Sequence, residues 1–89
     1  MIEVSFTSSF RRKLKRMIDK DAARKQRFEQ SLTKFIDDPF TESLRTHKLS
    51  GKLKGRWSFT VEYDLRVIFR FIDANRAVFE EIGRHKEVY

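Results

Sequence analysis

Apolar and polar residues alternate over residues 2–6, as they do in a short strand. The same period of two runs through residues 57–63 and residues 66–72. Residues 77–82 form a less regular apolar run, and residues 45–49 are expected to form one more short strand. The pattern therefore predicts one strand at the beginning of the chain and the others in its second half.

Between these strands the apolar period changes to that of a helix. The first helical face consists of Phe10, Leu14, Met17 and Ile18, and the second of Phe28, Leu32, Phe35 and Ile36. Thr7 and the serines after it offer N-cap hydroxyls, and Asp21 can cap the second helix. Pro39 ends that helix, because the residue before a proline avoids the α region. The pattern thus predicts a helical hairpin with an apolar side to cover.

The length of the loop between the two alternating strands decides which side chains share a face, because directly opposite residues of an antiparallel pair point the same way. A two-residue turn at Asp64-Leu65 would place Phe59 opposite Arg70, mixing core with charge. A three-residue loop over residues 63–65 instead pairs Glu62 with Arg66. It also makes these pairs: Val61 with Val67, Phe59 with Phe69, and Trp57 with Phe71. We therefore predict the three-residue loop.

This register leaves one face of the hairpin wholly apolar, and we expect the helices to cover it. The free face is predicted to carry Ser58, Thr60, Glu62, Arg66, Ile68 and Arg70. In the last strand Val78 and Phe79 cannot both face the core, so a bulge is expected at a position that the pattern does not fix. Residues 83–89 are expected to be a short tail. The fold class is a small single α+β domain over residues 1–89, with the N-terminal strand and helical hairpin on one face of an antiparallel-rich sheet.

The amino-acid composition excludes several classes of function. The 89 residues include no cysteine and only two histidines, which removes thiolate catalysis and makes a His-rich metal site unlikely. No apolar run reaches the roughly 18 residues of a membrane span, and the first residues do not read as a signal peptide, so a cytoplasmic location is expected. The net charge of +7 favours a polyanionic partner, with nucleic acid ahead of an acidic protein.

Few residues are candidates for chemistry. His47 and His85 can transfer protons, although a lone histidine is more often an ordinary surface residue. Asp64 suits a turn, and Arg66 either pairs with Glu62 or stabilises charge on a phosphate. Tyr89 either packs against the sheet or stacks on a base. A basic loop that could position a phosphate backbone carries Lys48, Lys52, Lys54 and Arg56.

No nucleotide-binding loop, paired-carboxylate motif or nucleophile elbow is present. If the domain catalyses a reaction, RNA cleavage fits best. The 2′-hydroxyl of RNA can act as the nucleophile while side chains supply the base, the acid and charge stabilisation, so no cofactor or metal is needed.

The order of elements, together with residues 47–57, 63–69 and 82–89, resembles the RelE/ParE superfamily of bacterial toxins, and its RelE and YafQ branches above all. The resemblance covers essentially the whole chain. It implies a RelE-like fold and the toxin of a type II toxin–antitoxin pair. Such toxins cut mRNA, typically in the ribosomal A site, and leave a 2′,3′-cyclic phosphate. It also implies a cognate antitoxin that blocks the site and contacts operator DNA as part of the complex.

The resemblance assigns roles to five residues. His47 and Asp64 match active-site positions of YafQ-like members, and His85 matches their C-terminal histidine, the expected general acid or base. Tyr89 matches the terminal aromatic that contacts the substrate, and Arg66 the arginine that steadies the scissile phosphate in RelE-like members. The expected RNA-binding set is Lys48, Lys52, Lys54, Arg56, Arg70 and Arg84.

Two positions depart from the family pattern. Thr60 stands where YafQ-like members carry a second histidine and RelE-like members a lysine, and Ser58 stands where RelE-like members carry another lysine. The site therefore has fewer proton-transfer groups than its relatives. Two alternatives remain open from the sequence: a ParE-like toxin that inhibits DNA gyrase, and a degenerate toxin that only binds its antitoxin.

Overall fold

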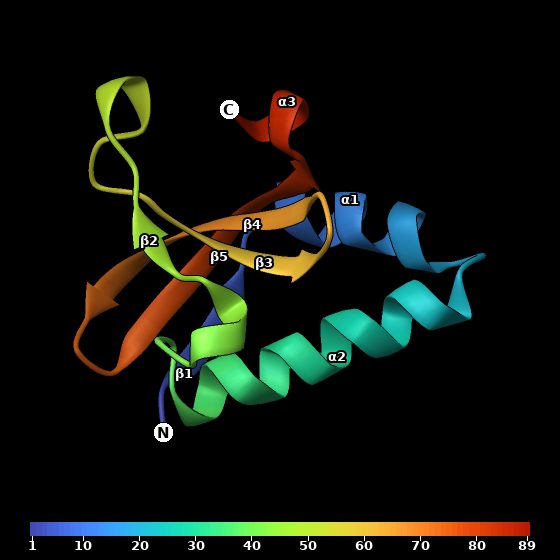
Figure 1. The fold of residues 1–89 in the computed structure, drawn as a ribbon, viewed down its shortest axis with the longest axis horizontal. Helices are drawn as coiled ribbons and strands as arrows, with labels where there is room; N and C mark the ends of the chain where they lie inside the picture. Colours follow the sequence, from blue (N-terminus) through green and yellow to red (C-terminus); the bar gives the residue numbers. More distant parts are fainter.

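Five strands form one sheet that carries both long helices on a single face (Figure 1). The computed structural model describes residues 1–89. Its elements are β1 (Glu3–Phe6), α1 (Ser8–Ile18), α2 (Ala22–Asp37), η1 (Glu42–Leu44), β2 (His47–Lys48), η2 (Gly51–Leu53), β3 (Trp57–Glu62), β4 (Leu65–Asp73), β5 (Arg76–Arg84) and α3 (His85–Val88). The strand order is β1-β5-β4-β3-β2, and only the β1–β5 pair is parallel. The predicted α+β class is confirmed.

The predicted helix boundaries follow from local chemistry. The Thr7 hydroxyl accepts a hydrogen bond from the Phe10 amide at 3.0 Å, and the Asp21 carboxylate accepts one from the Arg24 amide at 2.9 Å. Each bond satisfies an amide that lacks a partner within its helix. The helix α2 ends at Asp37, shortly before Pro39, as expected. None of the helices has the length and apolar character that crossing a membrane requires.

The core between helices and sheet is built largely from phenylalanine rings. Phe35 of α2 is fully buried, with its ring centroid 5.2 Å from that of Phe59, 4.9 Å from Phe69 and 5.0 Å from Phe79. These partners lie on β3, β4 and β5, so one helix residue ties three strands together. Rings packed edge to face bury a large apolar area per residue, which matters in so small a domain.

The register of the β3–β4 hairpin differs from the predicted one by two residues. Phe59 pairs with Val67 rather than Phe69, and Leu65 pairs with Glu62 across a two-residue turn, Tyr63-Asp64. The extra residue is Val61, which forms a bulge between Thr60 and Glu62. A two-residue turn with one bulged residue has the same parity as a three-residue loop, so the predicted apolar face is correct although the predicted loop is wrong.

Of three other expectations, two needed adjustment and one, the bulge in the last strand, is confirmed. The predicted strand over residues 45–49 is reduced to the two residues of β2. The bulge expected in the last strand lies at Glu80, since Ile68 pairs with Glu81 while Phe69 pairs with Phe79. The expected tail continues β5 to Arg84 and then forms the one-turn helix α3.

Candidate active site

Arg66 lies on β4, on the sheet face opposite the helices. Its neighbours across the strands are Thr60 on β3 and Gly83 on β5. The Arg66 Nη1 group donates a hydrogen bond to the Thr60 hydroxyl at 2.7 Å, while the buried Nε–H has no partner. The guanidinium group therefore sits on the face on which the sequence predicts it, with donor capacity left over for a ligand.

Glu62 does not share that face, contrary to the prediction. The bulge at Val61 turns the Glu62 carboxylate toward α2, where it accepts from Arg24 Nε at 3.0 Å and from Arg27 Nη1 at 2.7 Å. Of the two roles that the sequence left open for Arg66, the ion pair with Glu62 is therefore absent. Arg66 is left without a carboxylate partner.

The helix α3 brings His85 and Tyr89 back over the sheet. The Tyr89 hydroxyl lies 2.5 Å from the Oγ atom of Ser58, and the ring of Tyr89 packs edge-on against His85 with centroids 4.2 Å apart. At the other end of the turn the Glu87 carboxylate accepts from the Arg84 amide at 2.7 Å. A four-residue helix is too short to be stable alone, so these contacts fix where His85 and Tyr89 point.

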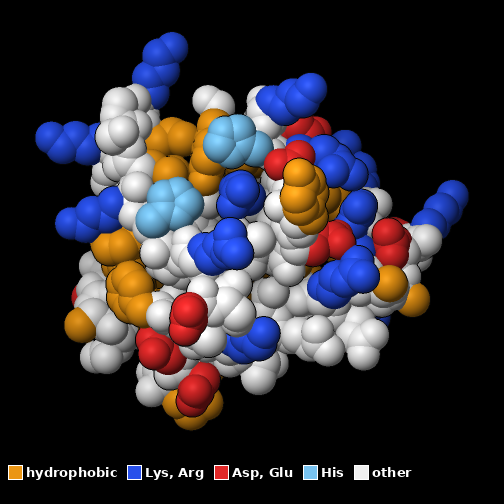
Figure 2. Space-filling view, in the orientation of Figure 1, with side chains coloured by type: hydrophobic (Ala, Val, Ile, Leu, Met, Phe, Trp, Pro, Cys, Tyr) orange, Lys and Arg blue, Asp and Glu red, His pale blue; other side chains and the backbone are white.

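Ser58 also connects the tail to His47. His47 on β2 is the ladder partner of Ser58, which is fully buried. The Nδ1 atom of His47 lies 2.9 Å from the Arg45 carbonyl, so Nδ1 carries the proton and Nε2 is left as an acceptor in the neutral ring. Figure 2 shows both histidine side chains on one face of the molecule, with Lys and Arg side chains close by.

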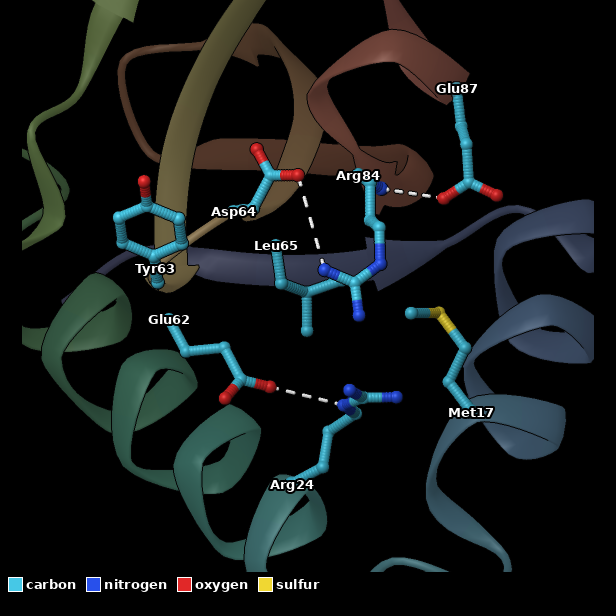
Figure 3. Close-up of a pocket in the computed structure, with 8 residues that line it drawn as sticks. All are labelled: Met17, Arg24, Glu62, Tyr63, Asp64, Leu65, Arg84 and Glu87. Atoms are coloured by element: carbon cyan, nitrogen blue, oxygen red, sulfur yellow. Dashed lines mark hydrogen bonds and ion pairs between the residues drawn. The ribbon is translucent and has the colours of Figure 1, made fainter.

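Asp64 is placed apart from these groups. It lies in the β3–β4 turn and faces Arg84 Nη1 at 3.9 Å, and no hydrogen bond or ion pair joins it to Arg66 or His85. Figure 3 shows this carboxylate beside a pocket of about 280 Å³ between the hairpin turn and the long helices. The pocket is lined by Met17, Arg24, Glu62, Tyr63, Asp64, Leu65, Arg84 and Glu87.

The predicted RNA-binding residues divide into two groups. Lys52 and Lys54 are exposed around η2, and the Lys48 ammonium lies 5.5 Å from the centroid of the Trp57 ring. The others are in ion pairs: Arg56 and Arg70 share Glu80 at 2.6 and 3.1 Å, and Arg84 faces Asp64. Sequence reasoning missed the partner Glu80, because its orientation depends on the bulge that it occupies.

The structure changes the surroundings expected for one site residue and adds another that the sequence did not single out. Ser58 was expected on an open face but is fully buried and accepts a hydrogen bond from Tyr89, a contact for which no local sequence signal exists. Arg45 was not singled out, although its carbonyl holds His47. No three side chains of the kinds that bind metal ions come together anywhere in the chain.

One protein-family model matches almost the whole chain. The family model described as "Bacterial toxin of type II toxin-antitoxin system, YafQ" matches residues 2–89. No curated protein matches the sequence.

Solved structures share the fold. The YoeB/ParE toxin from Agrobacterium tumefaciens has a TM-score of 0.80 at 18% identity, covering 94% of this chain and 99% of that one. YafQ from E. coli strain BL21(DE3) has a TM-score of 0.75 at 20% identity, covering 100% and 99%. The E. coli DinJ–YafQ complex gives 0.67 at 21% identity, covering 100% and 99%. At these identities the likeness concerns the fold alone.

Proposed function

The chain belongs to the YafQ family of toxins of bacterial type II toxin–antitoxin systems, and from this premise we propose that it is a metal-independent endoribonuclease that cleaves mRNA. One observation carries the proposal. Arg66, which has no carboxylate partner, shares the sheet face opposite the helices with Ser58, around which His47, Tyr89 and His85 are gathered. Cation, proton acceptor and proton donor are the groups that phosphodiester cleavage needs.

The proposed reaction is an internal transfer. The 2′-oxygen of one ribose attacks the adjacent phosphorus while the bond from phosphorus to the 5′-oxygen of the next nucleotide breaks. A base takes the proton from the 2′-hydroxyl, and an acid gives a proton to the departing 5′-oxygen. The products are a 2′,3′-cyclic phosphate and a 5′-hydroxyl. Arg66 stabilises the charge that builds on the phosphoryl oxygens.

The two histidines suit the two proton transfers. We assign the base to His47, because its Nδ1–H bond to the Arg45 carbonyl leaves Nε2 free to accept. His85 then serves as the acid, and Tyr89 beside it contacts the substrate. Asp64 is assigned an indirect role through Arg84, from which α3 begins.

The test is cleavage of mRNA by the purified toxin with and without translating ribosomes, read by primer extension. His85→Ala should reduce the cleavage rate by about 10²–10⁴-fold, since a proton-transfer group is lost. Arg66→Ala should reduce it by about 10²–10³-fold. Arg12→Gln removes one charge from the exposed face of α1, on the helix side of the sheet, and should cleave normally. Both site variants should also relieve the growth arrest caused by expression without antitoxin.

The same assays separate the alternatives. Growth arrest with intact messages and inhibited gyrase supercoiling would replace the proposal with a ParE-like activity. Wild-type expression without any effect on growth would indicate a toxin homologue that only binds its antitoxin. Cleavage that occurs solely on translating ribosomes would identify the A site as the place of action, and cleavage of naked mRNA would remove the ribosome from the proposal.

We further propose that the protein binds a cognate antitoxin and that it contacts operator DNA only as part of this complex. The family description names a toxin–antitoxin system, and the E. coli relative of the same fold forms a complex with DinJ. The location that follows from this proposal is the cytoplasm.

A further inference from the structure

Arg45 and Arg66 differ from the other arginines beyond α2 in having no acidic partner. Six arginines follow α2, and four of them form ion pairs. The four paired residues are Arg56, Arg70, Arg76 and Arg84. Arg45 and Arg66 line one pocket of about 310 Å³ at the side of β3, together with the hydroxyl-bearing residues Ser43 and Thr60.

The backbone at Arg45 is the second observation. Arg45 is the only residue other than glycine with a positive φ, at 52°. This left-handed conformation follows η1 and is one that glycine adopts without steric cost, whereas a long side chain does not. Strained positions of this kind tend to occur at functional sites. An arginine here suggests that its side chain is needed where the turn by itself would favour glycine.

The third observation is the state of the surrounding polar groups. The Arg66 side chain makes a single hydrogen bond, from Nη1 to the Thr60 hydroxyl, so most of its donors are unused. Glu62 also lines the pocket, but Arg24 and Arg27 already hold its two carboxylate oxygens. The pocket therefore combines two unpaired guanidinium groups and hydroxyls, which is a donor set suited to a phosphate diester.

We propose that Arg45 and Arg66 together bind one backbone phosphate of single-stranded RNA, with Arg45 as a binding residue beside the cleaving centre. The inference rests on the proposed function, because it names the substrate contact of the same face. Arg45 has a double role: its side chain binds the phosphate, while its carbonyl holds the His47 ring that accepts the 2′-proton. A phosphate bound by the Arg45 side chain is thereby held at a fixed position relative to the general base His47.

The experiment measures binding of a labelled single-stranded RNA, 2′-O-methylated throughout so that it cannot be cleaved, by fluorescence anisotropy over a range of salt concentrations. Arg45→Gly should weaken binding about tenfold, because one charge-assisted contact is lost. The slope of log affinity against log salt should fall by about 0.7, the value for one phosphate contact on a single strand. The Tm should stay the same or rise, since glycine relieves the backbone at this position.

Arg12→Gln is the matched control for loss of one positive charge, and its salt slope should equal that of the wild type. The double variant Arg45→Gly/Arg66→Gln should lose less than the sum of the single losses in free energy, because both side chains hold the same phosphate. Three results would overturn the inference. The Arg45→Gly variant could bind RNA as tightly as the wild type, or Arg12→Gln could lose as much affinity as Arg45→Gly. The losses of binding free energy could also be strictly additive in the double variant. RNA that binds through Arg45 without any cleavage of unmodified RNA would leave this site standing and refute the proposed activity instead.

Discussion

At the scale of single residues, Ser58 shows where prediction from sequence stops. Alternation along the strand placed Ser58 correctly on the face opposite the helices. It is completely buried, and its side-chain oxygen lies 2.5 Å from the hydroxyl of Tyr89, 31 positions later in the chain. Contact across such a separation depends on where β5 ends and how α3 turns back. Local patterns contain neither piece of information.

The Ser58–Tyr89 contact should matter for cleavage more than for stability. We expect Ser58→Ala to slow single-turnover cleavage about tenfold, because the tyrosine loses the hydrogen bond that orients its ring. Tyr89→Phe should produce a similar loss, and the double variant should be no slower than the worse single variant. Thr33→Ala, which removes an exposed hydroxyl of α2, is the control and should have no effect on the rate. Independent, additive losses would show that Ser58 does not act through Tyr89.

At the scale of elements, the helices were predictable and the hairpin register was not. Thr7 and Asp21 cap their helices through contacts within one turn, so the sequence contains the whole cause. The β3–β4 register depends on whether Val61 forms a bulge. Parity cannot distinguish a three-residue loop from a two-residue turn with one bulged residue, because both place the same side chains on the same face. The consequence for the site is direct, because the bulge carries Glu62 away from Arg66.

The turn between β4 and β5 has a pH-dependent contact. A hydrogen bond from the Arg76 side chain, with one from the Asn75 amide, lowers the pKa of Asp73 below its usual value. A lowered folded-state pKa means that the contact stabilises the protein above the unfolded-state pKa of about 3.9 and is lost as the pH falls through the folded-state pKa. Asp73→Asn should therefore lower the Tm slightly at pH 7, and thermal melts should show this difference shrinking below about pH 4.

At the scale of the whole molecule, part of the sheet topology was predictable from the sequence and part was not. The sequence indicated one sheet with helices on a single face, and the phenylalanine-rich core confirms it. It did not indicate that β1 lies beside β5 in parallel, because pairing between the two ends of a chain leaves no trace in either segment alone. The net charge, in contrast, is counted from the sequence and does not depend on the fold.

The net charge of +7 leads to a prediction about the antitoxin complex. Attraction between a basic toxin and an acidic partner is screened by salt, with a Debye length of about 10 Å at 0.1 M. Titration calorimetry between 0.05 and 0.5 M NaCl should show the affinity falling by at least about tenfold, mostly through slower association. An affinity independent of salt would mean that apolar contacts dominate the interface.

The position of β5 between β1 and β4 has a consequence for synthesis of the protein. Until the ribosome has translated this strand, β1 has no neighbour and β4 has only one, so a nascent chain cannot complete the sheet. Such long-range pairing also makes folding slow compared with that of a helical bundle of the same size. A gene interrupted anywhere upstream of β5 should therefore yield an inert product, and cells escaping this toxin should accumulate nonsense and frameshift mutations across nearly the whole reading frame.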